Sequence, residues 1–294
     1  MTAEPGPTVV VGQPVPRVDA VAKAMGDAVF GVDVRFPGML VGRILRAGVP
    51  HARIARLDTS AAARVAGVRA IVTGADCARR HGLFVKDQPA LAVDRVRFAG
   101  EVVAAVAADD DDAAQEALDR IDVEYEELPV VTDAVEAMRP GATLLHPDQM
   151  AYERAEVPGM SLDPVPGTNI SYHFKLRRGD VDVAFDGADV VVEDTFSTPF
   201  IQYAHLEPHV AIALWDADGV MTLWTSTMGP HTVRGMLAEL LTCRSGACAS
   251  SRRWSAAATA RRCTCARSLR RRRCSPRRCP GGTSVSASTA RTSS

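Results

Sequence analysis

The chain has 294 residues, with 34 Lys and Arg against 35 Asp and Glu, a formal net charge of −1. No stretch comes near the roughly 18 consecutive apolar residues of a membrane-spanning helix, so we expect no membrane partner. The charges are nevertheless unevenly distributed along the chain. The residues after Leu241 include 13 Arg and no Asp or Glu, so residues 1–241 hold 21 basic and 35 acidic residues.

The cysteines divide at the same place. Cys77 stands alone in the first 241 residues, and the other six lie in the last 53. A single cysteine in a body of this length is typical of a reducing compartment. The N-terminus also lacks the basic start and apolar run of a signal peptide. We therefore expect a cytoplasmic protein.

The first ordered region is expected from Arg17, after an extended segment over residues 1–16 that is rich in Gly and Pro. Pro37-Gly38 predicts a tight turn, followed by a strand over 40–46. A short helix is expected over 61–65, with Asp58 or Thr59 as its cap, and a buried strand over 68–72.

A strand, a helix and a second strand are expected between residues 98 and 128. The apolar run 98–107 reads as a strand, and 122–128 alternates apolar and acidic residues as an edge strand does. The acidic run Asp109–Asp112 lies between them, where negative side chains complement the dipole of a helix N-terminus. We interpret this run as helix capping and not as a metal site, and predict an α+β domain over 17–132.

Residues 133–168 hold five prolines and little periodicity, which indicates an interdomain linker. A second, incomplete α+β domain is expected over 169–241. In it, Gly179-Asp180-Val181 opens a short helix through Phe185, and 188–193 begins a strand.

The segment 198–231 predicts a hairpin that delivers a loop to the start of a helix. Val210, Ile212 and Leu214 alternate with smaller residues, a turn follows at 217–219, and Val220–Ser226 returns as the second strand. A helix is expected over 231–241. The intervening loop, Thr227, Met228 and Gly229, is the candidate binding site, because loops on rigid scaffolds commonly carry function.

Other polar and aromatic residues here favour structural roles. We expect His205 and Glu207 to shape the hairpin through hydrogen bonds, and not to bind metal. His51, His146 and His231 are expected in packing or on the surface. Trp215 and Trp224 are expected in the core and on strand faces.

Several motifs now form an ordered set that resembles a known family. The set begins with Arg17, Asp19, Lys23 and Gly26, and continues with Pro37-Gly38-Met39-Leu40, Pro50-His51-Ala52, Asp58, Gly67-Val68, Phe98-Ala99-Gly100-Glu101-Val102-Val103-Ala104, Val123-Glu124-Tyr125-Glu126-Glu127-Leu128-Pro129, Gly179-Asp180-Val181 and His205-Leu206-Glu207-Pro208. With this spacing, residues 12–241 resemble the N-terminal part of the molybdopterin-binding large subunit of the xanthine dehydrogenase, aldehyde oxidase and carbon monoxide dehydrogenase family. The resemblance implies an a/b hammerhead domain followed by the start of the first molybdopterin-binding domain.

The resemblance also implies molybdenum-dependent hydroxylation, or a related oxidation, by an enzyme whose [2Fe–2S] clusters and FAD lie on partner subunits. These partners are an iron–sulfur small subunit and an FAD-binding medium subunit. The family places a glutamine beside the apical oxo group of molybdenum, and its aligned position here is Met228. A thioether cannot donate the hydrogen bond of a glutamine amide. The family's catalytic glutamate lies near the C-terminus of the subunit, so no catalytic residue and no metal ligand is expected within residues 1–241.

The segment 242–294 has three interpretations. Cys263 and Cys265 with Cys274 and Cys279 would suggest a metal site, but no pair has zinc-ligand spacing. Arg270–Arg273 would suit a nucleic-acid-binding arm. The third interpretation, which we favour over a nucleic-acid partner, is a frameshift in GC-rich DNA, which yields Arg, Ala, Ser, Pro and Cys together.

The frameshift hypothesis can be checked with synonymous codons. Residues 253–263 can be encoded so that a shifted frame reads Met-Val-Gly-Gly-Gly-Tyr-Gly-Ala-Lys-Met, the glycine-rich motif that the family has at this distance from the loop. Residues 288–294 shift likewise to the acidic sequence Phe-Asp-Arg-Glu-Asp-Glu-Phe. We therefore expect a truncated oxidoreductase subunit that binds no cofactor and is inactive alone, with a disordered tail. The alternative is a non-enzymatic interaction module that docks the iron–sulfur and flavin subunits.

Overall fold

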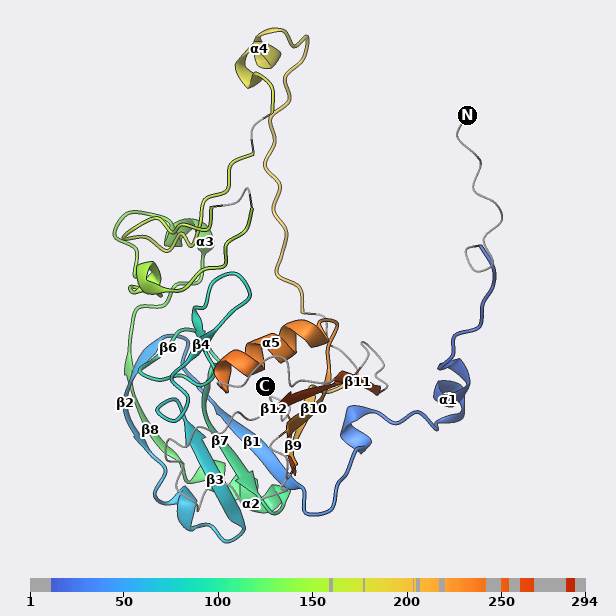
Figure 1. Cartoon of the computed structure of the whole chain (residues 1–294). Helices are drawn as coiled ribbons and strands as arrows, with labels where there is room; N and C mark the ends of the chain where they lie inside the picture. Colours follow the sequence, from blue (N-terminus) through green and yellow to red (C-terminus); the bar gives the residue numbers. More distant parts are fainter. Residues whose placement is uncertain are drawn as a thin grey trace.

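The computed structural model describes residues 12–158, 161–176, 178–202, 204, 207–216 and 220–241, together with the backbone of 250–253, 260–266 and 284–288. The fold is α+β, as the sequence predicts (Figure 1). None of the helices within these residues has the length and apolarity needed to cross a membrane.

The helices are short. The α-helices are α1 (Ala20–Met25), α2 (Asp111–Asp119), α3 (Ala134–Ala137), α4 (Val181–Asp186) and α5 (Pro230–Leu240), and the 3-10 helices are η1 (Gly31–Asp33), η2 (Ala62–Arg64) and η3 (Gln149–Ala151). The strands are β1 (Leu40–Arg46), β2 (Ala52–Asp58), β3 (Val68–Thr73), β4 (Arg80–His81), β5 (Gln88–Pro89), β6 (Arg95–Val96), β7 (Val102–Ala108), β8 (Asp122–Glu127), β9 (Val210–Trp215), β10 (Val220–Ser226), β11 (Ser250–Arg253), β12 (Ala260–Ala266) and β13 (Ser284–Ser288).

The first core forms where α2 covers the antiparallel strands β1, β7 and β3. Ala104 and Val106 of β7 pack against Ala117 and Ile121 of the α2 region, and all four are buried. The Asp110 carboxylate caps α2 by accepting the Ala113 backbone N–H at 2.8 Å, which confirms the capping interpretation of the acidic run.

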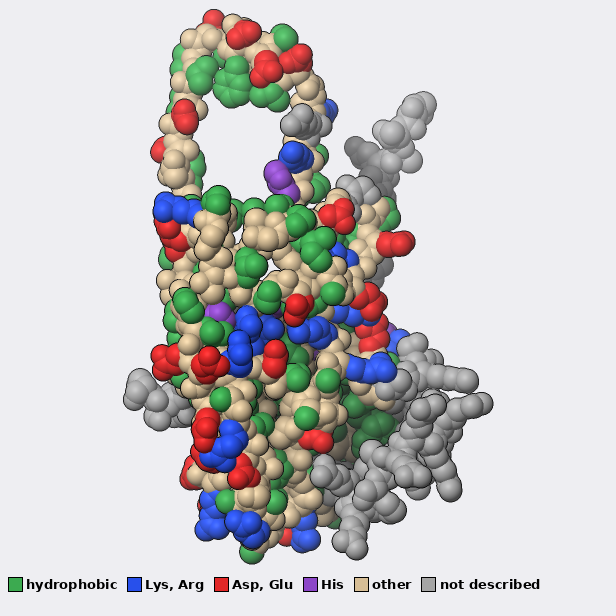
Figure 2. Space-filling view, turned by 90° about the vertical axis from the view of Figure 1, so that its left-hand side faces the viewer, with side chains coloured by type: hydrophobic (Ala, Val, Ile, Leu, Met, Phe, Trp, Pro, Cys, Tyr) green, Lys and Arg blue, Asp and Glu red, His purple; other side chains and the backbone are tan. Residues whose placement is uncertain are grey.

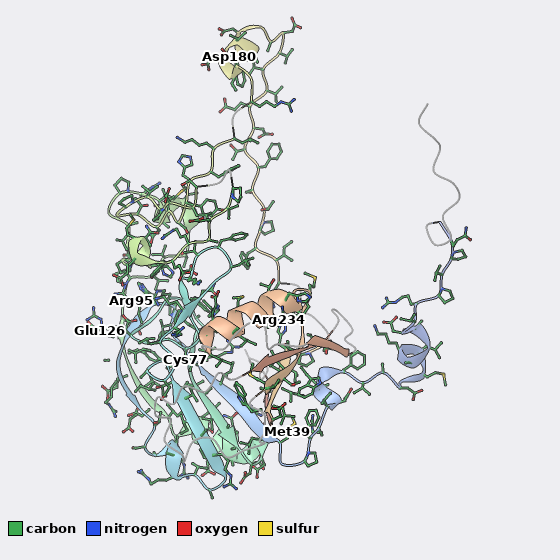
Figure 3. The ribbon with its side chains drawn as sticks, viewed as in Figure 1. Met39, Cys77, Arg95, Glu126, Asp180 and Arg234 are labelled. Carbon is green, nitrogen blue, oxygen red and sulfur yellow. The ribbon has the colours of Figure 1, made fainter. Side chains whose placement is uncertain are left out.

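A three-stranded antiparallel sheet, ordered β6-β2-β8, lies beside this core. Its inner face carries Val96, which packs with Val103 and Ala47. Its outer face is charged, and Arg95 and Glu126 mark it in Figure 3. β8 is an edge strand of this sheet, as its alternating acidic residues predict.

The predicted hairpin and helix are present as β9, β10 and α5. β9 and β10 are antiparallel, with Ile212 opposite Trp224. Both of these side chains are buried, and the Trp224 ring contacts Phe36 with ring centroids 4.8 Å apart. Met221 packs against Ala238 and Leu237 of α5. The predicted turn at 217–219 lies outside the described residues.

Two local predictions were wrong, and one strand was not predicted. The Asp58 carboxylate accepts the Ser60 N–H at 2.8 Å and does not cap the short helix, whose N-cap is Ala61. The segment 98–101 precedes β7 as a loop, with Phe98 exposed, because β7 begins only at Val102. The strand β2 was missed because Arg53 and Arg56 interrupt its apolar residues. Both arginines pair with β8 carboxylates on the outer face of the sheet.

The segment after the linker also differs from expectation. Residues 171–176 and 178–202 form an arm that rises away from the two sheets, with α4 at its tip (Figure 1). α4 begins after the Asp180 cap, as expected. The segment 188–193 is extended but is not a strand, because its backbone makes no ladder with a neighbouring segment within the described residues.

Three backbone segments of residues 242–294 lie as strands in the part of the chain that the structure describes, and the disorder expected of this segment stays a prediction. β12 pairs antiparallel with β10, β11 pairs with β12, and β13 lies between β9 and β1. Backbone groups on the edges of β9, β10 and β1 accept such partners without any need for large apolar side chains. The resulting sheet has the order β11-β12-β10-β9-β13-β1-β7-β3.

Candidate functional site

The candidate loop lies between the end of β10 at Ser226 and the start of α5 at Pro230. Within it, the Gly229 backbone N–H donates to the Thr227 hydroxyl at 3.1 Å. The Gly229 carbonyl accepts the Val233 N–H at 3.0 Å, the first bond of the helix. Pro230 is buried and supplies a backbone φ suited to the first helical position. The loop is therefore held at both ends by the elements that flank it.

Met228 is the residue that this loop presents. Its side chain is 90% exposed, so position 228 is open to another molecule. The thioether sulfur is a weak acceptor and has no hydrogen to donate. Gly229 has a φ of −114°, and an added Cβ would lie 3.4 Å from the Thr232 hydroxyl, an ordinary van der Waals contact.

The base of the loop contains a contact that sequence reasoning missed. The Ser226 hydroxyl donates to Glu207 Oε1 at 3.2 Å and so ties the end of β10 to the segment before β9. Gly31 approaches the same carboxylate, because a Cβ placed there would lie 3.8 Å from Glu207 Oε1. Glu207 acts as a hydrogen-bonding residue of the hairpin, as the sequence predicts. His205 lies outside the described residues.

The far end of α5 is held by the β4–β5 region and the linker. The Lys86 ammonium lies 2.6 Å from Glu153 and 3.1 Å from Glu239, the residue before the last of α5. These carboxylates, Glu153 first, raise the pKa of Lys86. The Arg79 guanidinium donates to the Glu239 carbonyl at 3.2 Å.

These residues, with Tyr152, line a cavity of about 600 Å³ where three segments meet. The sequence carried no pattern for this junction, since its members are up to 160 positions apart.

Of three other histidines, His51 and His146 have structural surroundings. His51 is buried and its Nδ1 lies 2.7 Å from the Pro129 carbonyl. His146 Nδ1 lies 3.0 Å from the Tyr152 hydroxyl, and burial, assisted by Arg97, lowers the pKa of His146. His231 is exposed at the start of α5. Among the residues that the structure describes, no group of three or more His, Cys, Asp or Glu could hold a metal ion.

The candidate loop is exposed at Met228 and lies between a strand and a helix. The Met228 side chain has no hydrogen-bond donor, so it does not supply the amide hydrogen bond expected of a glutamine at this position.

Two family profiles match the chain in succession. The profile described as "Aldehyde oxidase and xanthine dehydrogenase, a/b hammerhead domain" matches residues 25–129. The profile described as "Molybdopterin cofactor-binding domain" matches residues 162–247. The first match covers β1 to β8, and the second covers the arm, the hairpin and α5.

Individual proteins are similar to most of this chain. The chain is 38% identical over 234 residues to the nicotinate dehydrogenase large molybdopterin subunit of Eubacterium barkeri, which covers 79% of this chain and 51% of the relative. It is 34% identical over 226 residues to a probable xanthine dehydrogenase subunit of Bacillus subtilis, covering 76% of this chain and 28% of the relative. The reconstituted CO dehydrogenase from Oligotropha carboxidovorans superposes with a TM-score of 0.67 at 30% identity, over 80% of this chain and 30% of that one. The chain thus spans between about a quarter and half of the length of these proteins.

Proposed function

Because the chain belongs to the xanthine dehydrogenase, aldehyde oxidase and carbon monoxide dehydrogenase large-subunit family, with its a/b hammerhead domain and part of its molybdopterin-binding domain, we propose that it is the first part of a molybdenum-dependent hydroxylase subunit. The observation that carries this proposal is the succession of the two matches in one chain. The complete subunit would bind the molybdenum cofactor, which supplies the oxidising centre for hydroxylation of a small organic substrate. We place it in the cytoplasm, since the single cysteine of the first 241 residues suits a reducing compartment.

The proposed partners are an iron–sulfur small subunit and an FAD-binding medium subunit, which would carry [2Fe–2S] clusters and FAD. The names of the relatives support this, since they describe a "large molybdopterin subunit", a "large chain" and a "molybdenum-binding subunit", each of which is one component of a larger assembly.

We further propose that residues 242–294 arise from a shifted reading frame and that this polypeptide is inactive alone. The molybdopterin-domain match ends at residue 247, close to the change of composition after Leu241. Thr227, Met228 and Gly229 remain the proposed cofactor-facing loop. Met228 gives that loop no hydrogen-bond donor.

The test combines sequencing of the DNA across the codons for Leu240 to Cys243 with molybdenum analysis by mass spectrometry. We expect one missing or additional base, and about one molybdenum per restored large subunit in its complex against none in the 294-residue chain. An intact frame together with stoichiometric molybdenum in the 294-residue chain would refute the frameshift and the inactivity. A restored complex free of molybdenum would refute the hydroxylase assignment.

A second candidate function is an interaction module that docks the iron–sulfur and flavin subunits without catalysis. It is favoured by two buried clusters that lie wholly within residues 45–125 of the hammerhead domain and do not involve the cofactor domain. Co-purification of both partner subunits with the 294-residue chain, without molybdenum, would support this function. Failure of either partner to bind would exclude it.

A further inference from the structure

A short part of the linker, residues 145–155, is docked on the hammerhead domain, and we call it the strap. At its first end the Arg97 guanidinium donates to the Leu145 carbonyl at 3.1 Å. Near its second end the Lys86 backbone N–H donates to the Glu153 carbonyl at 2.9 Å. The strap is therefore held at two points by groups that belong to the hammerhead domain.

His146 lies inside the strap and is half-buried. Its Nδ1 lies 3.0 Å from the Tyr152 hydroxyl, and the two rings meet edge to face with their centroids 5.6 Å apart. A neutral imidazole can accept the hydroxyl proton at this nitrogen, whereas an imidazolium carries a hydrogen on both nitrogens and accepts none. The contact that folds the strap on itself therefore depends on the protonation state of His146.

The charged groups around His146 are mostly cations. They come from β4, from the residue before β5, from β6 and from the segment before β7, and are Arg80, Asp87, Arg95 and Arg97 respectively. The Arg80 guanidinium lies 4.8 Å from the centroid of the Tyr152 ring, so the partner of His146 already faces a cation. On the side of the molecule that Figure 2 shows, Lys and Arg side chains gather below the arm, with Asp and Glu beside them.

These surroundings disfavour a proton on His146. Burial, followed by the charge of Arg97, lowers the pKa of His146 below its ordinary 6.5, and Asp87 acts in the opposite direction. A released strap would expose the ring to water and return the pKa towards that ordinary value. The docked strap therefore binds the proton more weakly than the released one.

We propose that the strap is a pH-sensitive latch, which is docked while the His146 imidazole is neutral and is released from the hammerhead domain when this imidazole takes up a proton. The stabilisation of the docked state is fully present above pH 6.5, and it falls as the pH drops through the lowered pKa of the docked ring. The latch uses only groups of this chain and does not depend on the proposed function.

Release of the strap reaches α5 through one lysine. Glu153 of the strap lies 2.6 Å from the Lys86 ammonium, which also lies 3.1 Å from Glu239 near the end of α5. When Glu153 leaves with the strap, Lys86 loses the nearer of these two carboxylates, and the cavity that all three residues line becomes more open. The candidate loop with Met228 lies at the other end of the same helix, so the latch connects pH to the element that follows this loop.

The experiment follows hydrogen exchange of the full 294-residue chain at about pH 7.5 and about pH 5.5, corrected for the intrinsic exchange rate at each pH. We expect opening of residues 146–155 to increase by about twofold to tenfold at the lower pH. About tenfold is the most that one histidine with an ordinary pKa in the released state can supply over this range. Exchange in the last turn of α5 should rise in parallel, and β7 in the hammerhead core should keep its protection.

The variant His146→Asn removes the titrating ring and keeps an amide oxygen that can accept the Tyr152 hydroxyl proton. It should abolish the increase at low pH, although Asp87 and Glu101 still titrate in it. The matched control is His173→Asn, which changes an exposed histidine of the arm and should leave the increase unaltered.

A second variant keeps the test valid if His146→Asn docks poorly. Tyr152→Phe deletes the hydroxyl partner of His146 and retains the aromatic ring that faces Arg80. The neutral imidazole then has no bond to lose on protonation. The strap should open more at pH 7.5 than in the original chain, and its further increase at pH 5.5 should be smaller.

A strap whose exchange is the same at both pH values would overturn the inference. An equal increase in His146→Asn would overturn it as well, since another group would then be responsible. An increase of the same size in β7 would indicate acid unfolding of the whole domain and not a latch. An unchanged last turn of α5 would overturn the connection through Lys86. An increase that is confined to the strap and α5, absent in His146→Asn and retained in His173→Asn, would establish the latch.

Discussion

At the residue scale, the cap of α2 shows how one carboxylate sets the start of a helix. Asp110 has extended backbone geometry and accepts the Ala113 N–H, while Asp112 lies in the first turn without a cap bond. Asp110→Ala should lower the free energy of unfolding by about 1 kcal/mol, because one backbone donor loses its partner. Urea denaturation measures this. Asp112→Ala is the control and should cost only a few tenths of that amount; equal losses would contradict the cap.

Glu101 is a buried carboxyl group whose behaviour should depend on pH. It is 7% exposed and accepts the Arg97 backbone N–H at 2.6 Å, and burial raises its pKa above the ordinary 4.5. The folded state therefore holds the Glu101 proton more tightly than the unfolded state. Stability from this group is present below pH 4.5 and is lost as the pH rises through the raised pKa.

The variant Glu101→Gln tests this dependence, since its amide oxygen can still accept the Arg97 N–H. We expect the stability of the variant relative to the original chain to increase between pH 4.5 and pH 7, as the ionised carboxylate becomes the costly form. Urea midpoints at the two pH values measure the difference. A difference that is constant with pH would show that the proton is not involved.

At the element scale, Lys86 joins α5 to the linker. Lys86→Met removes the contacts with Glu153 and Glu239 but keeps a side chain of similar length. We expect hydrogen exchange in the last turn of α5 to accelerate by about twofold to tenfold, since that turn loses a cation near its carbonyls. High salt should diminish the effect. Lys175→Met, an exposed lysine of the arm, serves as the control and should leave α5 unchanged.

The same scale separates what the sequence could predict from what it could not. β1, β3, β7, β9, β10, α2 and α5 follow from periodicity, capping residues and turns that act locally. β2 was missed because Arg53 and Arg56 owe their place to carboxylates on β8, about 70 residues away. The candidate loop was located correctly between β10 and α5, but its anchor to Glu207 and the junction at Lys86 depend on tertiary contacts that no local pattern records.

At the scale of the whole molecule, the two parts of the chain differ in how many of their large apolar side chains are buried. The hammerhead region has buried clusters of its own, whereas the arm exposes most of its large apolar residues. A polypeptide of residues 17–132 should therefore unfold cooperatively, and one of residues 171–241 should be poorly soluble without a sharp transition. Calorimetry and sedimentation measure the two. A sharp cooperative melt of 171–241 would contradict this expectation.

The position of β13 has a consequence for synthesis. β13 is the strand that joins β9 to β1, and it is the last described segment of the chain. The helix α2, the sheet β6-β2-β8 and the strands β1, β7 and β3 are all encoded before residue 128. At a translation rate of about 5–20 residues per second, this region leaves the ribosome several seconds before β13 is made. The N-terminal half can therefore fold on the ribosome with the contacts among its own strands and α2. Residues translated after a change of reading frame near residue 241 would be made only after this domain has folded.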